Sequence, residues 1–342
     1  MIMPRNINET NLNNVTLIRT GEDSVEIRWS FSELPQKVTV YAGTSPDQID
    51  RQHPVSICRE KSSADISGLD PNRRYYFEVV PSRGSRVIIS DRRVTLKGSV
   101  NFRDLGGYET ADGRRIKWGQ VFRSDNLGRL SDGDVAFVQG LGIRTVCDFR
   151  TPAEAQKLPD RFRPTAQDRY LHLPIQHGEF DPAGTFERIK KGDVAWMTEA
   201  FMIEGYLKNI DHFAAVWSTV FNTLAERSNR PLVFHCTGGK DRAGVCAALV
   251  LLSLGVPEQT VVYDHGLSNR YIAAVLERIY QQIRSYGVDP DQVAPYFTAP
   301  QKAIVAVVDH IRRTYGSATD YLINNAGVGE KLIEKLKADL LE

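Results

Sequence analysis

Leu-Val-Phe-His-Cys-Thr-Gly-Gly-Lys-Asp-Arg-Ala-Gly is the sequence from Leu232 to Gly244, where a predicted strand, a short loop and a predicted helix follow one another. The run from Pro231 to Phe234 is short and apolar, which is typical of a buried strand, and the apolar run that starts at Ala243 is long enough for a core helix. The glycines of the loop let its backbone fold tightly with the amides pointing inward. Because the helix adds unpaired N–H groups and the positive end of its dipole, the stretch predicts a site for a phosphate dianion.

The side chains of this loop have the chemistry of a phosphate-transfer site. Cys236 and Arg242 are separated by five residues. A helix N-terminus and cationic neighbours favour the thiolate form of a cysteine, so Cys236 is predicted to be a nucleophile at neutral pH. The planar guanidinium of Arg242 can bind two phosphate oxygens, and Lys240 adds a second positive charge. A Walker loop is excluded because Asp241 follows the lysine, whereas a buried structural cysteine is the plainer alternative.

The order of strand, His-Cys, five residues, Arg and helix resembles the signature of the cysteine-dependent phosphatases of the protein-tyrosine-phosphatase superfamily. Lys-Asp-Arg at 240–242 resembles in particular the bacterial atypical subfamily, whose members often accept both phosphotyrosine and phosphoinositides. Asn-Phe-Arg-Asp-Leu-Gly-Gly-Tyr at 101–108 is similar to the opening phrase of that subfamily, and residues 315–328 are similar to its C-terminal pattern. The resemblance implies an α/β phosphatase domain over residues 97–342, with a parallel sheet flanked by helices.

The resemblance also assigns roles to individual residues. Cys236 and Arg242 are the predicted catalytic pair, and a carboxylic acid must protonate the leaving oxygen. We favour Asp241 as this general acid because the loop fixes its position, and Asp181, on a loop after a predicted strand at 169–174, is the alternative. The phosphate-binding residues are predicted to be Thr237, Gly238, Gly239, Lys240, Ala243 and Gly244.

Two further predicted strands, 121–123 and 143–149, end at or just before an arginine. Residues at strand C-termini face the site in parallel α/β folds, so Arg123 and Arg150 are candidate cations near the phosphate, although we favour an ion pair of Arg150 with Glu154 as the role of Arg150. A helix capped by Ser131 is predicted to reach residue 141. Further helices are predicted over 192–227, 257–265, 268–285, 300–314, 319–324 and 330–341.

Residues 12–96 have a different character, with short alternating runs separated by turns, and they follow a leader of residues 1–11. Val25, Ile27 and Trp29 alternate with polar residues, which places them on one face of a strand. Gly-Leu-Asp-Pro-Asn-Arg-Arg-Tyr-Tyr-Phe-Glu-Val at 68–79 resembles the loop and strand that carry the tyrosine corner of a fibronectin type III domain. We therefore predict an all-β sandwich before the phosphatase domain.

The second half of this sandwich is basic. A solvated face is the plainer interpretation, and a contact with a protein, an acidic lipid surface or the catalytic domain is the sharper hypothesis. The residues concerned are Arg73, Arg74, Arg83, Arg86, Arg92 and Arg93.

The overall composition narrows the classes of partner and location. The 342 residues include 43 Lys and Arg against 42 Asp and Glu, so the formal net charge of +1 gives no case for general nucleic-acid binding. No apolar run is long enough to span a bilayer and no signal peptide is visible, so a cytoplasmic location is expected, with non-classical export left open. The wide spacing of the cysteines indicates neither a disulfide framework nor a zinc site. These are Cys58, Cys147, Cys236 and Cys246.

The predicted function is metal-independent hydrolysis of phosphate monoesters through a cysteinyl-phosphate intermediate. No cofactor is expected, because the loop supplies the positive charge that metal ions supply in other phosphatases. Phosphotyrosine is the expected substrate class, and phosphoserine, phosphothreonine and phosphoinositides are kept beside it. Two alternatives are a catalytically weak phosphate-binding or phosphoinositide-binding module and another thiol enzyme, of the sulfur-transfer or arsenate type.

Overall fold

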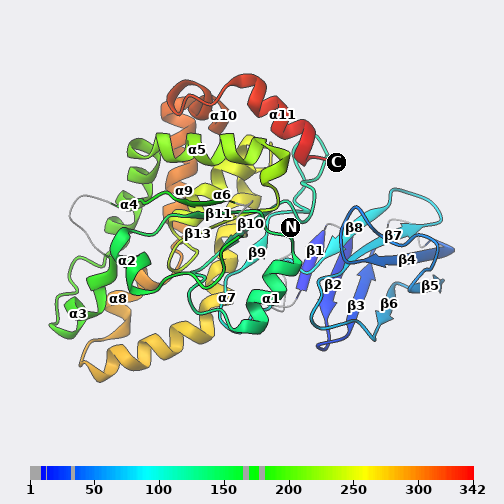
Figure 1. The fold of residues 1–342 in the computed structure, drawn as a ribbon, viewed down its shortest axis with the longest axis horizontal. Helices are drawn as coiled ribbons and strands as arrows, with labels where there is room; N and C mark the ends of the chain where they lie inside the picture. The colour runs from blue at the N-terminus through cyan, green and yellow to red at the C-terminus, as the bar shows by residue number, and fades with distance from the viewer. Residues whose placement is uncertain (1–8, 13, 32–34, 165–168, 177–181) are drawn as a thin grey trace.

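The computed structural model describes residues 9–12, 14–31, 35–164, 169–176 and 182–342. An all-β part built from the N-terminal residues lies beside a larger α/β part, and the two are in contact (Figure 1). No helix of the described residues combines the length and apolar character needed to cross a membrane.

The N-terminal part is a sandwich of two four-stranded antiparallel sheets. One sheet has the order β1(Glu9–Leu12), β2(Val15–Arg19), β3(Val25–Trp29), β6(Ser63–Ile66), and the other has the order β5(Ser56–Arg59), β4(Lys37–Gly43), β7(Tyr76–Pro81), β8(Val87–Ser90). Val25, Ile27 and Trp29 are all buried, which confirms the predicted face of β3. The predicted sandwich is thus present.

Two strands of the sandwich lie outside the sequence predictions. β1(Glu9–Leu12) begins in the segment that we predicted to be a leader, and that prediction was wrong for residues 9–11, because β1 pairs along its whole length with β2. β5, Ser-Ile-Cys-Arg, has Ile57 facing outward and Cys58 facing inward, so its pattern is the reverse of an ordinary half-buried strand. Strand pairing, and not local composition, makes both segments extended.

The α/β part contains a five-stranded sheet with the order β12(Arg169–His172), β11(Thr145–Asp148), β13(Leu232–His235), β10(Val121–Ser124), β9(Arg103–Asp104). The four strands from β12 to β10 are parallel, as predicted, and β9 runs antiparallel to β10 at one edge. His235 lies in register with Ser124 on one side and with Asp148 on the other. Three strands therefore end side by side at the place where the phosphate loop begins.

Helices cover both faces of this sheet (Figure 1). Their bounds are α1(Asp132–Gly140), α2(Pro152–Lys157), α3(Thr185–Lys190), α4(Glu199–His212), α5(Ala214–Ala225), α6(Arg242–Ser253), α7(Glu258–Ser285), α8(Pro290–Phe297), α9(Gln301–His310), α10(Ala318–Asp320) and α11(Glu330–Leu340), with single turns η1(Pro182–Gly184), η2(Arg227–Asn229), η3(Ile311–Tyr315) and η4(Tyr321–Asn325). Alternate residues of β13 enter different cores: Leu232 and Phe234 pack with the helices α4 to α6, and Val233 packs on the α1 side. A continuous apolar strand buried on both faces is what a parallel sheet requires.

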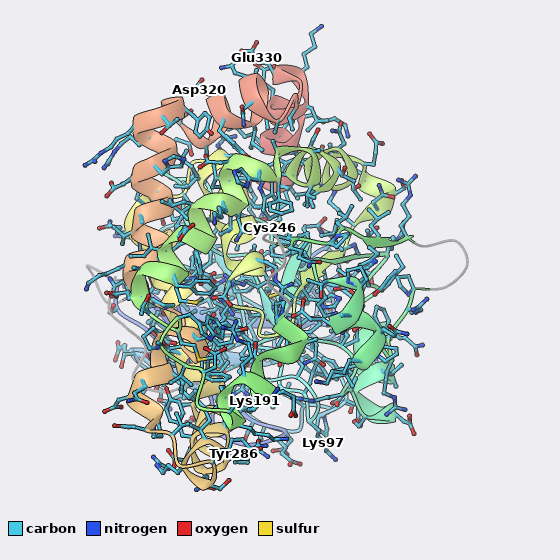
Figure 2. The ribbon with its side chains drawn as sticks, turned by 90° about the vertical axis from the view of Figure 1, so that its left-hand side faces the viewer. Lys97, Lys191, Cys246, Tyr286, Asp320 and Glu330 are labelled. Atoms are coloured by element: carbon cyan, nitrogen blue, oxygen red, sulfur yellow. The ribbon has the colours of Figure 1, made fainter. Side chains whose placement is uncertain are left out.

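Helix α6 is the central element of the larger core. Ten of its twelve residues are buried, and Cys246 lies near the middle of the molecule, with Asp320 and Glu330 toward one end and Lys191 and Tyr286 toward the other (Figure 2). This burial explains why the helix is apolar on all sides.

Several helices differ from the predicted ones. The single helix predicted over 192–227 is two helices, α4 and α5, which meet at Phe213, and the two helices predicted between 257 and 285 are one 28-residue helix. α8 was missed because it holds Pro290 and Pro295; Pro290 occupies the first turn, where a proline is tolerated. The predicted cap of α1 is confirmed, since Ser131 and Asp134 form a capping box.

The contact between the two parts is buried and specific. Trp118 belongs to the α/β part, yet it is 1% exposed and packs into the core of the sandwich, where its Nε1 donates to the Ile88 carbonyl at 3.0 Å. Arg74 of the sandwich donates to Asp104 of β9 at 2.7 Å, and Arg92 donates to the Asp104 carbonyl at 2.9 Å. The solvated-face interpretation was therefore wrong for Arg74 and Arg92, which contact the α/β part instead.

Candidate active site

The phosphate loop connects the end of β13 to the start of α6, as the sequence predicts. Gly239 has a φ of +65°, and a Cβ at this position would lie 2.5 Å from the Asp125 nitrogen and from the Ser124 carbonyl carbon. Gly238 has an ordinary φ, and the nearest atom to a Cβ there would be Lys240 Cγ at 3.5 Å. The close approach of the neighbouring backbone and the positive φ therefore require glycine at position 239 but not at position 238.

Cys236 lies at the base of this loop and is 1% exposed. The N-terminus of α6 begins six residues further on, and the charges of Arg123 and Arg242 interact with the Cys236 sulfur. Burial raises the pKa of Cys147, the thiol on β11, to about 12, so that cysteine is held in its neutral form. Cys236 differs from Cys147 in its position, where β13 leads into the loop and α6, near the charges of Arg123 and Arg242.

Arg242 is fixed by Glu154, which follows β11 in the chain. Its Nη1 donates to Glu154 Oε2 at 2.6 Å and its Nη2 donates to Oε1 at 2.8 Å, while Nη1 also donates to the Phe149 carbonyl at 3.1 Å. Among the described residues no acceptor faces the Arg242 Nε, so one edge of the guanidinium remains for a ligand. This is the fork geometry that suits two oxygens of one phosphate group.

Glu154 is itself held by the backbone and by the loop. It forms a capping box with Thr151 at the start of α2, and it accepts a hydrogen bond of 2.6 Å from the Thr237 hydroxyl. Burial alone would raise its pKa, but the hydrogen bonds and charge of Arg242 lower the pKa of Glu154 to about 2. The predicted ion pair of Arg150 with Glu154 was therefore wrong, because Glu154 pairs with Arg242. In the sequence, only the capping-box spacing of Thr151 and Glu154 indicated that the Glu154 side chain has a fixed position.

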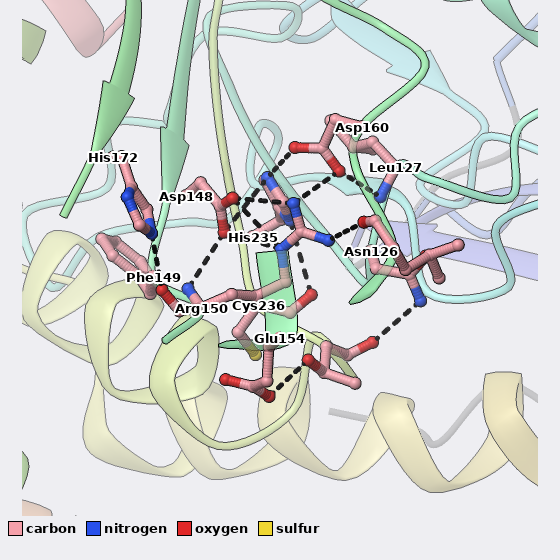
Figure 3. Close-up of polar contacts among 12 residues, drawn as sticks. Asn126, Leu127, Asp148, Phe149, Arg150, Glu154, Asp160, His172, His235 and Cys236 are labelled. Atoms are coloured by element: carbon pink, nitrogen blue, oxygen red, sulfur yellow. Dashed lines mark hydrogen bonds and ion pairs between the residues drawn. The ribbon is translucent and has the colours of Figure 1, made fainter. Parts of the chain in front are cut away.

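Arg150 belongs to a buried network behind His235 (Figure 3). Its Nη2 lies 2.7 Å from Asp148 and 2.9 Å from Asp160, and the Tyr170 hydroxyl donates to Asp148 at 2.7 Å. His235 Nε2 lies 3.0 Å from Asp160, an electrostatic contact without the alignment of a hydrogen bond. One ligand atom each from Asp148, Asp160 and His235 lie within 4.8 Å of one another, a spacing that could hold a metal ion, but the cation that the carboxylates face is Arg150.

Asp241 is held between two donors at the end of the loop. The Tyr206 hydroxyl donates to its Oδ1 at 2.7 Å, and Lys240 Nζ donates to both oxygens at 2.8 and 2.7 Å. Burial and the neighbouring carboxylate raise the pKa of Tyr206 well above 10, so this hydroxyl stays a donor. Lys240 also donates to the Tyr296 carbonyl at 2.8 Å, which ties its ammonium to α8. Nothing in the sequence indicated Tyr206 or Tyr296.

The remaining predicted site residues are placed as follows. Thr237 is exposed, and Ala243 and Gly244 are buried in the first turn of α6. A Cβ on Gly244 would lie 3.0 Å from His265 Nδ1, a ring that is buried and has no hydrogen-bond partner on either nitrogen among the described residues. Asp181, the alternative acid, lies outside the described residues.

Residues 94–342, which include the loop described above, are similar in sequence to known proteins. A sequence model of the tyrosine phosphatase family matches residues 94–342. A Cupriavidus necator protein, provisionally named a tyrosine-protein phosphatase, is 30% identical over 245 residues, which are 71% of this chain and 88% of that one. A tyrosine-protein phosphatase of Nostoc commune is 28% identical over 64% of this chain and 73% of its own. The triple specificity protein phosphatase PtpB of Mycobacterium tuberculosis is 28% identical over 72% of this chain and 98% of its own.

Proposed function

Because this chain belongs to the tyrosine phosphatase family, we propose that it hydrolyses phosphate monoesters through a cysteinyl-phosphate intermediate on Cys236. The observation that supports this mechanism most is the buried Cys236 at the base of a loop whose Arg242 is preset by Glu154 with one edge left open. Hydrogen-bond donors that are already in position stabilise the negative charge of the transition state without reorganisation. Such stabilisation supplies most of the rate enhancement in enzymes of phosphoryl transfer.

In the first step the phosphate monoester binds to the loop amides and to Arg242. The Cys236 thiolate attacks phosphorus in line with the ester oxygen, so that a P–S bond forms while the P–O bond to the leaving group breaks. The leaving oxygen takes a proton from Asp241, the proposed general acid. Asp241 is supported for this role by its fixed position between Tyr206 and Lys240.

In the second step a water molecule attacks the cysteinyl phosphate. The P–S bond breaks, inorganic phosphate leaves, and the thiolate of Cys236 is restored. The proton of the water passes to the Asp241 carboxylate, which returns the enzyme to its starting state. No metal or cofactor takes part in the proposed reaction, because Arg242 and the amides carry the charge stabilisation.

The proposed substrates are phosphotyrosine proteins, with phosphoserine, phosphothreonine and phosphoinositides as further candidates. The relative from Mycobacterium tuberculosis carries triple specificity in its name. Lys240, which we expected to contact substrate phosphates, is buried by its bonds to Asp241 and Tyr296, so we assign phosphate binding at this position to its backbone amide and not to its ammonium.

We further propose that the sandwich is a fibronectin type III-like domain and that the protein acts in the cytoplasm. The tyrosine-corner interpretation is supported by Tyr75, whose hydroxyl accepts a hydrogen bond of 3.2 Å from the Asp70 amide, five residues upstream. A corner of this kind locks the loop before β7 and carries no chemistry of its own.

The test is phosphate release from a phosphotyrosine peptide and from mono- and polyphosphoinositides, in the presence of EDTA, by wild type and Cys236→Ser. Release by wild type alone is expected, and the ratio between substrate classes gives the specificity. Abolition of wild-type release by EDTA would contradict the metal-independent mechanism. No release from any substrate would favour a phosphate-binding module, and equal release by the serine variant would favour different chemistry.

A further inference from the structure

The outer side of the phosphate loop is held by side chains that the mechanism above does not use. Three consecutive carbonyl groups of the loop each accept a hydrogen bond from a residue outside the loop. The bonds are Asn126 N and Nδ2 to the Thr237 carbonyl at 3.2 and 3.3 Å, Asn101 Nδ2 to the Gly238 carbonyl at 3.0 Å, and Arg123 Nη2 to the Gly239 carbonyl at 2.7 Å. Asn126 is seen beside the loop in Figure 3.

These bonds control the direction of the loop amides. In a trans peptide the C=O and the following N–H point in opposite directions, so a carbonyl that is drawn outward turns the next N–H inward. The amides concerned are those of Gly238, Gly239 and Lys240, and none of them donates to an acceptor among the described residues. Gly239 and Lys240 are buried and Gly238 is partly buried. Backbone N–H groups in such places are normally paired, so three unpaired ones in succession indicate a place prepared for an anion.

Arg123 is itself fixed by Asp264 of α7. Its Nη1 donates to Asp264 Oδ2 at 2.7 Å, and Arg103, which lies opposite Arg123 in the β9–β10 pair, donates to Asp264 Oδ1 at 3.0 Å. The Tyr108 hydroxyl donates to Oδ1 as well, at 2.9 Å. Burial would raise the pKa of Asp264, but the two arginines hold it well below its ordinary value. One carboxylate thus compensates two buried guanidinium groups and leaves an N–H of Arg123 directed at the loop.

The orientation of Asn101 is fixed in a similar way. Its Oδ1 accepts a hydrogen bond from Arg103 Nη1, and its backbone N–H donates to Asp125 at 3.1 Å. With the carbonyl end of the amide taken by a cation, the NH₂ end must face Gly238. The Arg103 side chain therefore supports both contacts on the loop carbonyls, one through Asn101 and one through Asp264.

We infer that Asn101 and Arg123 are positioning residues, which set the loop amides for oxyanion binding by holding the Gly238 and Gly239 carbonyls from behind. The inference rests on the proposed function, since it concerns the same loop. Neither residue contacts the phosphate group. Their effect on oxyanion binding passes through the backbone of the loop, and the charge that Arg123 places near Cys236 is kept in an Arg123→Lys variant.

The test uses the full-length chain and tungstate, an oxyanion that carries no leaving group. Asn101→Asp keeps the size and the acceptor toward Arg103 but replaces the donor toward Gly238 with a second oxygen. Arg123→Lys keeps the charge beside Asp264 but cannot reach Asp264 and the Gly239 carbonyl together. Both variants are expected to weaken inhibition by tungstate of p-nitrophenyl phosphate hydrolysis at least tenfold, and to raise KM in parallel.

Matched controls separate positioning from general stability. Asn229→Asp removes a buried donor to a backbone carbonyl, that of Thr223 at 2.9 Å, and Arg230→Lys changes a buried arginine that donates to Asp339 at 2.9 Å, at the end of β13 opposite the loop. Both contacts lie away from the loop, so these variants are expected to lower the melting temperature while their tungstate inhibition constants stay within about twofold of wild type.

The inference is overturned if Asn101→Asp and Arg123→Lys lose only melting temperature and keep tungstate affinity within twofold. If Asn101→Asp does not fold, Asn101→Ser replaces it in the inhibition assay. The rise in melting temperature that tungstate causes is then also measured for Arg123→Lys and compared with that of wild type. A wild-type protein that neither binds tungstate nor hydrolyses the ester would contradict the proposed function, and the inference with it. Wild-type activity with unaffected variants would contradict the inference alone.

Discussion

Glu154 is the residue on which the charge balance of the site depends. It neutralises Arg242, accepts from Thr237 and caps α2, so one carboxylate fixes the catalytic cation, one side of the loop and the start of a helix. Arg242 is buried beside Glu154, so removal of the carboxylate charge would leave a buried cation without a counter-charge. The free energy of unfolding lost in this way is larger than the net contribution of the ion pair to stability.

The stability of the protein should therefore depend on pH through Glu154. Its pKa falls from the ordinary 4.5 to about 2 on folding, so its contribution is present above pH 4.5 and is lost as the pH falls toward 2. The difference corresponds to about 3 kcal/mol. Glu154→Gln should be less stable at pH 7 by about that amount and should lose less stability between pH 5 and 3 than wild type, as measured by urea unfolding at each pH.

The control for this prediction is Glu187→Gln. Glu187 lies on the surface and pairs with Lys190 at 2.8 Å, an interaction that solvent screens. Its replacement should leave the stability close to that of wild type at either pH. If Glu154→Gln loses as much stability as wild type between pH 5 and 3, other carboxylates determine the acid sensitivity of the fold and the prediction is wrong.

Asp241 carries a second residue-scale prediction. A general acid matters most when the leaving oxygen is a poor leaving group, so Asp241→Asn should slow hydrolysis of a phosphotyrosine peptide about 10²-fold or more and that of p-nitrophenyl phosphate less. The acid is active when protonated, so the variant should also lose the decline of kcat toward high pH. Asp181→Asn is the comparison, and finding these changes in it instead would transfer the role.

At the scale of the element, strand β13, the phosphate loop and α6 form one unit whose geometry requires glycine at a single place. Gly239→Ala would force a Cβ into the backbone of residues 124 and 125 and a side chain into a positive φ. We expect a loss of about 2 kcal/mol or more in the free energy of unfolding, with loss of activity.

Gly238→Ala is the matched variant for this prediction. Its Cβ would meet only the Lys240 side chain at 3.5 Å, and its φ is ordinary, so the change in unfolding free energy should be small or slightly favourable. Chemical denaturation of both variants gives the comparison. Equal destabilisation by the two substitutions would contradict the distinction between the glycines.

The elements that sequence reasoning found are those whose own residues carry the signal. The apolar residues 232–234, the loop glycines and the alternation of Val25, Ile27 and Trp29 predict local structure directly, and the structure agrees. The missed features depend on partners distant in the chain. β1 exists through pairing with β2, and Glu154 and Tyr206 contact the loop only after folding, as does Asp264 the Arg123 side chain that holds the loop. The acid on the loop at 177–181 remains a prediction.

At the scale of the molecule, the sandwich and the α/β part share buried groups. Arg74 donates to Asp104 at 2.7 Å, and Trp118 fills the sandwich core. We therefore expect calorimetric unfolding of the full chain to give one transition. Trp118→Ala should cost about 3–5 kcal/mol and separate the melting of the two parts into two transitions, since it removes the apolar part of their contact.

Trp217→Ala is the control for this experiment. Trp217 is as deeply buried as Trp118 but packs within the α/β core, so its replacement should lower the melting temperature and leave a single transition. Two transitions in the wild-type protein would contradict the expected coupling.

Strand β9 has only two residues, and they serve different halves of the protein. The side chain of Arg103 reaches Asp264 under the phosphate loop, while that of its neighbour Asp104 receives Arg74 from the sandwich. Because the two residues are neighbours, the sandwich cannot be replaced without affecting the support of the phosphate loop. A chimera that grafts an unrelated sandwich onto residues 97–342 would leave Asp104 without its cation, directly next to Arg103, unless the graft supplies an arginine in the place of Arg74 and a pocket for Trp118. Protein engineers should therefore move the two halves of this chain together, as one piece.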